Sequence, residues 1–130
     1  MLRSLLAVFA GGMVGTALRL GADALIPSDA FPWSTLVVNV VGTFLLAVLV
    51  GRWWRIAPEW LRAGLGAGLL GAFTTFSAVM VSMLQFTTSG EILIAGVYLA
   101  ASLILGIVAA VAGLRLAGPR AISGIDEVNE

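Results

Sequence analysis

The 130-residue sequence contains no cysteine, no histidine and no lysine, and only 11% of its residues are charged. Without cysteine and histidine, disulfide bonds, thiolate or imidazole metal ligands, and cysteine or histidine catalysis are excluded. A soluble domain carries about 25% charged residues, so this shortage, together with 60% hydrophobic residues, indicates a membrane protein. The net charge of zero provides no general attraction to nucleic acid.

Four apolar runs, residues 5–18, 33–51, 63–86 and 92–114, predict four transmembrane helices. A spanning helix needs about 20 apolar residues, and the first run reaches this length only by including Arg19. That run also fits a signal peptide, because Arg3 precedes it and residues 22–24 form an A-x-A pattern. The glycines at 11, 12 and 15 and the nearby arginine argue against cleavage. The sequence therefore predicts an all-α membrane domain over residues 1–116 and a polar tail over residues 117–130.

The arginines predict an orientation. Six of the seven lie on the side that both termini share, and only Arg19 lies near the other side. Because positive residues are enriched in cytoplasmic loops, both termini are expected in the cytoplasm.

The third run contains a candidate break. Its uncharged stretch, residues 63–90, has 28 residues, which is too long for one straight span. Gly64 and Gly68 are explained by close helix packing, but the hydroxyl side chains of Thr74, Thr75 and Ser77 at the midpoint are not. Irregular backbone at membrane depth persists only where it is buried in protein or lines a cavity. Broken helices offer carbonyls to cations and amides to anions, so the pattern predicts ion coordination at this break.

Polar side chains also occur in the second and fourth runs. Asn39 either forms an interhelical hydrogen bond or donates an N–H to a permeating anion, and the sequence leaves both open. Tyr98 and Ser102 share one helix face and either satisfy each other or line a path. Since no Asp, Glu or Lys lies within a spanning core, a passive path fits better than proton-coupled transport. Groups that hold an anion without a cation are supplied by Asn39, Thr35, Phe73, Phe76, Ser77 and Ser102.

Three motifs, in order, resemble the signatures of the CrcB/Fluc family of fluoride channels. Residues 11–19 resemble its first-helix GGxxGAxxR signature, residues 34–44 its second-helix GTLxVNxxGxF signature, and residues 71–77 its GGxTTFS break. The chain length and the four-span layout agree with this family, and the likeness extends to about residue 116.

The resemblance implies a passive fluoride channel that lowers cytoplasmic fluoride. It also implies an antiparallel dimer with two pores and a central structural sodium ion, bound by the main-chain carbonyls of Gly71 and Thr74. The expected partners are fluoride, membrane lipid and a second subunit, and not nucleic acid. The positions that match the family's ion pathway and its first-helix arginine are Asn39, Phe76, Thr35, Tyr98, Ser102 and Arg19.

Several positions depart from the family pattern. Val79 replaces a second pore phenylalanine, Gly106 replaces a fourth-helix hydroxyl, and Ser34, Ala72 and Leu20 replace a glycine, a glycine and a tyrosine. A homodimer of oppositely inserted copies needs little orientation bias, whereas the arginine bias here is six to one. The alternative is therefore a heterodimer with an oppositely oriented homologue, in which each chain keeps only some pore positions intact.

Three other functions fit the sequence less well. A small multidrug exporter needs a membrane-embedded carboxylate, and the first run offers Arg19 instead. A non-conducting structural subunit does not account for Asn39 or for the hydroxyls of the break. An enzyme is not expected, because no pair of nucleophile and base can be assembled from these residues.

Overall fold

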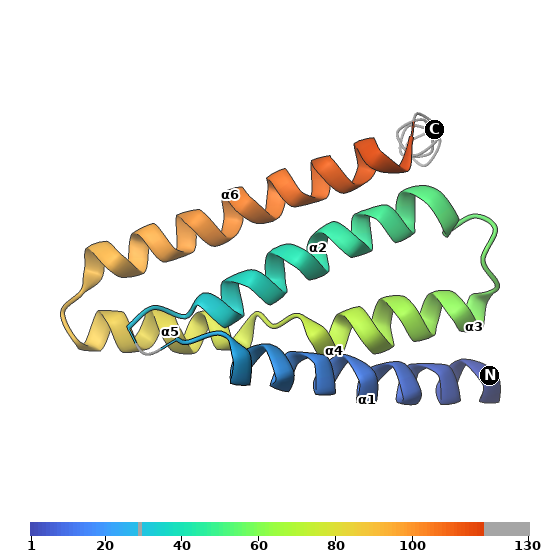
Figure 1. Cartoon of the computed structure of the whole chain (residues 1–130), viewed down its shortest axis with the longest axis horizontal. Helices are drawn as coiled ribbons and strands as arrows, with labels where there is room; N and C mark the ends of the chain where they lie inside the picture. The colour runs from blue at the N-terminus through green and yellow to red at the C-terminus, as the bar shows by residue number, and fades with distance from the viewer. Residues whose placement is uncertain (29, 119–130) are drawn as a thin grey trace.

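The computed structural model describes residues 1–28 and 30–118. Within these residues, four helical segments are long and apolar enough to cross a membrane: α1 (Leu2–Leu25), α2 (Trp33–Trp53), the segment Glu59–Thr88, and α6 (Ile92–Ala117). This confirms the four predicted spans. Figure 1 shows the start of α1 and the end of α6 at the same end of the bundle. Of the predicted polar tail, residues 119–130, Arg120 included, lie outside the described part, and Ala117 still belongs to α6.

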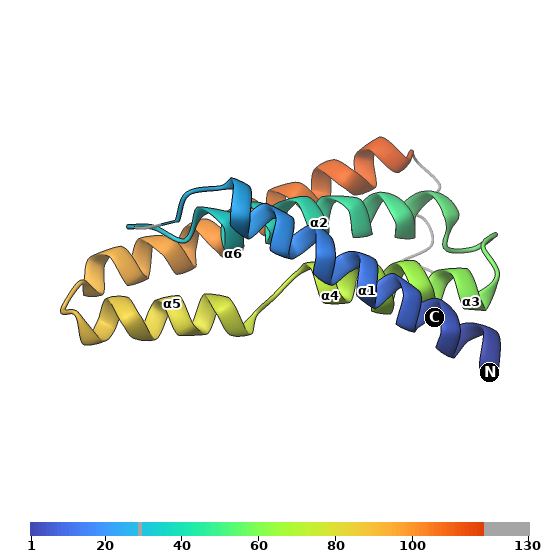
Figure 2. The same ribbon diagram turned by 60° about the horizontal axis from the view of Figure 1, so that its bottom comes forward.

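The third segment is interrupted, as its sequence predicts. It begins with α3 (Glu59–Arg62), continues as the π-helix η1 (Ala63–Leu70) and the short α4 (Gly71–Phe73), and resumes as α5 (Ser77–Thr88). Thr74, between α4 and α5, has an extended backbone with ψ of 162°. Figures 1 and 2 show this link as an extended, non-helical stretch of chain between two helical halves. The regular winding is therefore lost near the middle of the segment.

Glycines bring α1 into backbone contact with η1 and α4. A Cβ atom at Gly11 would collide with the main-chain oxygen of Gly64, and one at Gly15 with the main-chain oxygen of Leu69. From the other side, Cβ atoms at Gly64 and Gly68 would lie within 3.0 Å of α1. The small residues thus allow an approach that any side chain would prevent, as predicted for Gly64 and Gly68.

The other half of the bundle combines a close helix approach with larger side chains: a Cβ atom at Gly113 of α6 would lie 2.6 Å from the main-chain oxygen of Phe44 in α2. Here α2 lies along α6, and α5 packs against α6. A buried cluster joins these three helices, and the ring of Phe31 meets that of Tyr98 edge to face at 5.3 Å. The cluster consists of Leu36, Val79, Phe86, Ala95 and Tyr98.

The helix boundaries differ by a few residues from the expected ones. The first apolar run covers residues 5–18, but α1 begins at Leu2 and continues to Leu25. Asp23 lies one turn after Arg19, with 3.9 Å between Oδ2 and Nε, a spacing that supports helix continuation. After α2, the chain resumes helix at Glu59, directly after Pro58 in an extended conformation. Proline fits this entry position because its missing N–H has no helical partner there.

Candidate functional site

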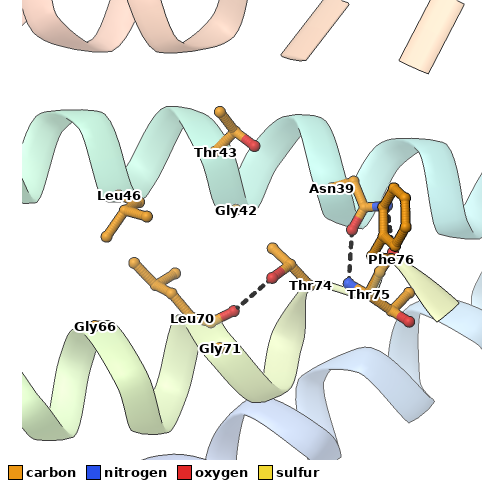
Figure 3. A pocket seen from close by; sticks show the side chains of 10 residues that line it. All are labelled: Asn39, Gly42, Thr43, Leu46, Gly66, Leu70, Gly71, Thr74, Thr75 and Phe76. Atoms are coloured by element: carbon orange, nitrogen blue, oxygen red, sulfur yellow. Dashed lines mark hydrogen bonds between the residues drawn. The ribbon is translucent and has the colours of Figure 1, made fainter. Parts of the chain in front are cut away.

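A cavity of about 310 Å³ lies beside the break, between α2 and the third segment. Its position is explained by Gly42, where a Cβ atom would collide with the side chain of Thr74, so α2 and the break approach closely. Figure 3 shows the side chains around it. The lining residues are Asn39, Gly42, Thr43, Leu46, Gly66, Leu70, Gly71, Thr74, Thr75 and Phe76.

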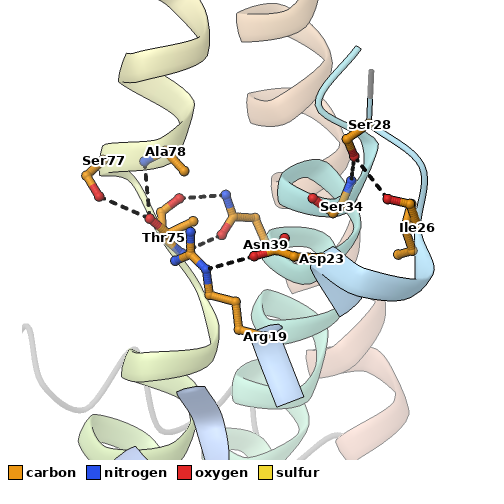
Figure 4. A network of polar contacts seen from close by, with 9 residues as sticks. All are labelled: Arg19, Asp23, Ile26, Ser28, Ser34, Asn39, Thr75, Ser77 and Ala78. Carbon is orange, nitrogen blue, oxygen red and sulfur yellow. Dashed lines mark hydrogen bonds and ion pairs between the residues drawn. The ribbon is translucent and has the colours of Figure 1, made fainter. Parts of the chain in front are cut away.

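The side chain of Asn39 is bound to the main chain of Thr75. Its Nδ2 donates to the Thr75 carbonyl at 2.8 Å, and its Oδ1 accepts from the Thr75 N–H at 2.8 Å. The amide therefore satisfies both polar backbone groups of one residue in the broken segment, as Figure 4 shows. Of the two interpretations that the sequence leaves open for Asn39, the interhelical hydrogen bond is present. The second N–H of Nδ2 is not used by this pair, because a primary amide has two donors.

Two main-chain carbonyls lose their helical donors at the break. In an unbroken α-helix, the N–H of Thr75 would bind the carbonyl of Gly71, and the N–H of Ala78 would bind the carbonyl of Thr74. Instead, the Thr75 N–H donates to Asn39 Oδ1, and the Ala78 N–H donates to Thr75 Oγ1 at 3.2 Å. Side chains thus divert both amides away from the two carbonyls that the resemblance assigns to sodium.

The three hydroxyls of the break have different roles. Thr74 Oγ1 donates to the carbonyl of Leu70 at 2.9 Å, which closes the end of α4. Thr75 is buried, and its Oγ1 accepts from Ala78 and lies 3.2 Å from Ser77 Oγ. Ser77 is exposed on the single chain. Only Thr74 and Thr75 line the cavity, so Ser77 is connected to it through Thr75.

Phe76 lies at the rim of the cavity and is 71% exposed. The ring is therefore available at the surface of the single chain, next to the extended backbone of Thr74.

Other expected pathway residues lie away from the cavity. Tyr98 is fully buried in the cluster of α2, α5 and α6, and its hydroxyl has no hydrogen-bond partner among the described residues. Ser102 Oγ donates to the main-chain oxygen of Tyr98 at 2.8 Å rather than to its hydroxyl. Thr35 is buried one turn before Asn39 and does not line the cavity.

Arg19 lies at the level of the break. One turn earlier, Gly15 lies against the main chain of Leu69 and Phe73, at the start of the break. Its ion pair with Asp23 at 3.9 Å is long, and both side chains are partly exposed. Such pairs contribute little to stability.

The two departures in the pore pattern have different surroundings. Val79 is 4% exposed and belongs to the buried cluster with Tyr98. In contrast, a Cβ atom at Gly106 would meet nothing within 4 Å.

The sequence interpretation gave no specific role to Thr75 or Gly42. Thr75 uses its N–H, its carbonyl and its hydroxyl to hold the break. A second threonine at mid-membrane was the available signal, but only the structure shows which of the two binds Asn39. At Gly42, the neighbour that prevents any side chain is Thr74 of the break.

Known proteins resemble this chain over most of its length. The model of the family described as "CrcB-like protein, Camphor Resistance (CrcB)" matches residues 6–114. A relative from Rhizobium johnstonii named "Fluoride-specific ion channel FluC" is 42% identical, over 88% of this chain and 94% of that protein. A relative from Geobacillus kaustophilus named "Fluoride-specific ion channel FluC 2" is 37% identical, over 92% and 97%. One from Pseudomonas fluorescens, also named "Fluoride-specific ion channel FluC", is 39% identical, over 89% and 98%. The chain is therefore a multi-pass membrane protein that belongs to the CrcB family.

Proposed function

We propose that this chain is a subunit of a passive, fluoride-selective channel and not an enzyme, and that the cavity beside the break is part of the ion pathway. The names of its relatives support fluoride as the ion. The observation that carries the proposal is the Asn39–Thr75 pair, which keeps polar groups at a cavity inside the membrane. The anion is expected to meet the second N–H of Asn39, the hydroxyl of Thr43 and the edge of the Phe76 ring.

The chemistry of the break also supports a structural sodium ion. The carbonyls of Gly71 and Thr74 lack their usual helical donors, because Asn39 and Thr75 bind those amides. Carbonyl oxygens of an unwound membrane helix are suitable cation ligands. A bound sodium ion would compensate these dipoles and fix the two halves of the segment, without itself being transported.

The exposed state of the break supports a dimer. Phe76 and Gly71 are exposed on the single chain, and open backbone is not tolerated against lipid. A second subunit laid over this surface would cover the break, close the cavity and bring further carbonyls to the sodium site. Arginines concentrated at the end shared by both termini favour that end in the cytoplasm.

Fluoride efflux from liposomes tests the channel proposal. The purified protein is expected to release fluoride, measured with an ion-selective electrode, and to release no measurable chloride. Phe76→Leu is expected to reduce the flux, whereas Phe44→Leu, on α2 but outside the cavity lining, serves as the matched control. Chloride release at a comparable rate would refute the selectivity.

A heterodimer is the second candidate, in which this chain needs an oppositely oriented homologue. It is favoured by Val79, whose buried place in the apolar cluster offers no aromatic ring to a pathway, and by the six-to-one arginine bias. In that case the chain alone conducts poorly and coexpression with a homologue of opposite bias restores efflux. Fast efflux from liposomes that contain only this chain would exclude it.

A further inference from the structure

A second cavity, of about 230 Å³, lies at the arginine-rich end of the bundle. It is lined by the end of α2, the connection to α3 and the start of η1, whereas Asn39 lies in the first half of α2. Its lining is apolar except for one guanidinium, and consists of Leu49, Trp53, Trp54, Ile56, Ala57, Leu61, Arg62 and Leu65.

The positively charged side chain of the cavity, Arg62, is held in place by Trp54. Arg62 Nη1 donates to the main-chain oxygen of Trp54 at 3.4 Å, and the guanidinium carbon lies 5.8 Å from the centre of the Trp54 ring. A Cβ atom at Gly66 would lie 3.3 Å from Trp54 Cη2, so this ring is also held against η1. The guanidinium has five N–H donors, and within residues 1–28 and 30–118 no ion pair of Arg62 is found. A positive charge with donors to spare therefore faces an apolar cavity.

The surroundings match the surface of an anionic membrane. Arg52, Arg55 and Arg115 lie at this same end, where Glu59 is the acidic residue of α3. Trp53 is half exposed beside the cavity, as expected for an indole at headgroup depth. Basic pockets between transmembrane helices are known to bind anionic lipid headgroups, and arginine binds phosphate through paired hydrogen bonds.

We propose that this cavity binds one anionic phospholipid. Its phosphate lies against Arg62, and the first part of one acyl chain lies between Leu49, Ala57 and Leu65. Both halves of the site are needed for this occupant: a free inorganic anion would leave the apolar wall uncovered, and a neutral lipid would leave the guanidinium without a counter-charge. The site is separate from the ion pathway, so the inference does not depend on which ion the protein conducts.

Quenching of tryptophan fluorescence by brominated lipids tests the proposal. The full chain carries Trp33→Phe and Trp60→Phe, which leaves Trp53 and Trp54 at the cavity as the emitters. It is reconstituted in phosphatidylcholine bilayers in which either phosphatidylglycerol or a matched share of phosphatidylcholine is brominated near the start of its acyl chains. The anionic lipid is expected to bind about fivefold more strongly than the neutral one, which is the order of effect of one arginine at an anionic surface.

Three variants separate the site from diffuse surface charge. Arg62→Gln is expected to bring the preference close to one, whereas Arg52→Gln removes the same charge at the same end but outside the cavity and should retain it. Ala57→Phe fills the cavity and should reduce quenching by both lipids, with helical content checked by circular dichroism. Equal quenching by the two lipids in the parent protein would overturn the proposal, as would equal losses in Arg62→Gln and Arg52→Gln. If neither brominated lipid quenches Trp53 and Trp54 in the parent protein, the proposal is overturned, because a protein such as a second copy of the chain then covers the cavity.

Discussion

Asn39 and Thr75 exchange two hydrogen bonds of 2.8 Å across the interface between α2 and the broken segment. The side-chain amide of Asn39 supplies the partners that an uninterrupted helix would supply to the main chain of Thr75. Because these partners come from another helix, the third segment can lose a turn without leaving the Thr75 backbone unpaired in the membrane. The break is thus a property of two helices together.

Replacing Asn39 by leucine should damage both folding and conduction. The change leaves the N–H and the carbonyl of Thr75 unpaired, at an expected cost of about 1–3 kcal/mol, and removes an anion donor from the cavity. We expect a lower unfolding temperature in detergent and at least tenfold slower fluoride efflux. Thr88→Val, which removes a hydroxyl bonded to Leu84 within its own helix, is the control and should change neither. Unaltered efflux with Asn39→Leu would contradict the assigned role.

Sodium should stabilise the protein, and Thr75 should control that effect. A ligand at a hundred times its dissociation constant contributes about 2.7 kcal/mol to the free energy of unfolding, so replacing sodium by N-methylglucamine should lower the unfolding temperature. In Thr75→Val, the Ala78 N–H loses its side-chain acceptor and becomes available to the Thr74 carbonyl, so the sodium effect should shrink. Thr74→Val removes the hydroxyl that donates to Leu70, but Ala78 still donates to Thr75 Oγ1, so the main-chain carbonyl of residue 74 stays available to sodium. The sodium effect should therefore persist in this variant.

For the sodium prediction, thermal unfolding is measured for the parent and for both valine variants, with and without sodium. Loss of the sodium response in Thr74→Val but not in Thr75→Val would assign the site to side-chain oxygen and contradict the main-chain site.

Gly15→Ala should be strongly destabilising. Its Cβ atom would meet the main-chain oxygen of Leu69 and the main-chain nitrogen of Phe73, and backbone atoms of packed helices do not move aside easily. Overpacking of this kind costs about 1–3 kcal/mol. Gly21→Ala, in the same helix and with nothing within 4 Å of the added atom, should be neutral or stabilising by up to about 1 kcal/mol. Equal unfolding temperatures for the two variants would contradict the close packing of α1 on η1.

The sequence was sufficient to predict the four spans, the break and the packing at Gly64 and Gly68, because each depends on a local pattern. Run length decides the spans, and the size of one residue decides whether two helices can touch. The partner of Asn39 was not predictable in this way, since it depends on how α2 and the break align, and Asn39 and Thr75 are 36 residues apart in the sequence. The π-helical winding of η1 is also absent from any local pattern, although its glycine content permits it.

The burial of Val79 shows a second limit of sequence interpretation. By resemblance, residue 79 is a pore position, yet the residue present packs among Leu36, Phe86 and Tyr98. Whether a helical residue faces a path or a core depends on the rotation of α5 after the break, which a local sequence pattern does not specify.

The single substitution Val79→Phe, which introduces the family's phenylalanine, should therefore destabilise the protein and not improve conduction. Val79 is 4% exposed, and its larger replacement has to displace the packed rings of Phe86 and Tyr98, so Val79→Phe should cost about 1–3 kcal/mol. Gly106→Ser, by contrast, enters open space and should leave the free energy of unfolding within about 0.5 kcal/mol of the parent. Unfolding in detergent measures both; a stable Val79→Phe protein with faster efflux would mean that this side chain faces the pathway.

Tyr98→Phe should separate conduction from folding. The Tyr98 hydroxyl is buried and forms no hydrogen bond of good geometry within the described residues, with the side chains of Ser82 and Ser102 near it, so its removal should change the free energy of unfolding by no more than about 1 kcal/mol. If the hydroxyl serves the permeating anion, the same variant should slow fluoride efflux several-fold. Tyr98→Leu is the control for the ring itself: it removes the edge-to-face contacts with Phe31 and Phe86 and should destabilise the protein by about 2 kcal/mol or more. Normal efflux in a stable Tyr98→Phe protein would remove Tyr98 from the pathway and leave it a purely packing role.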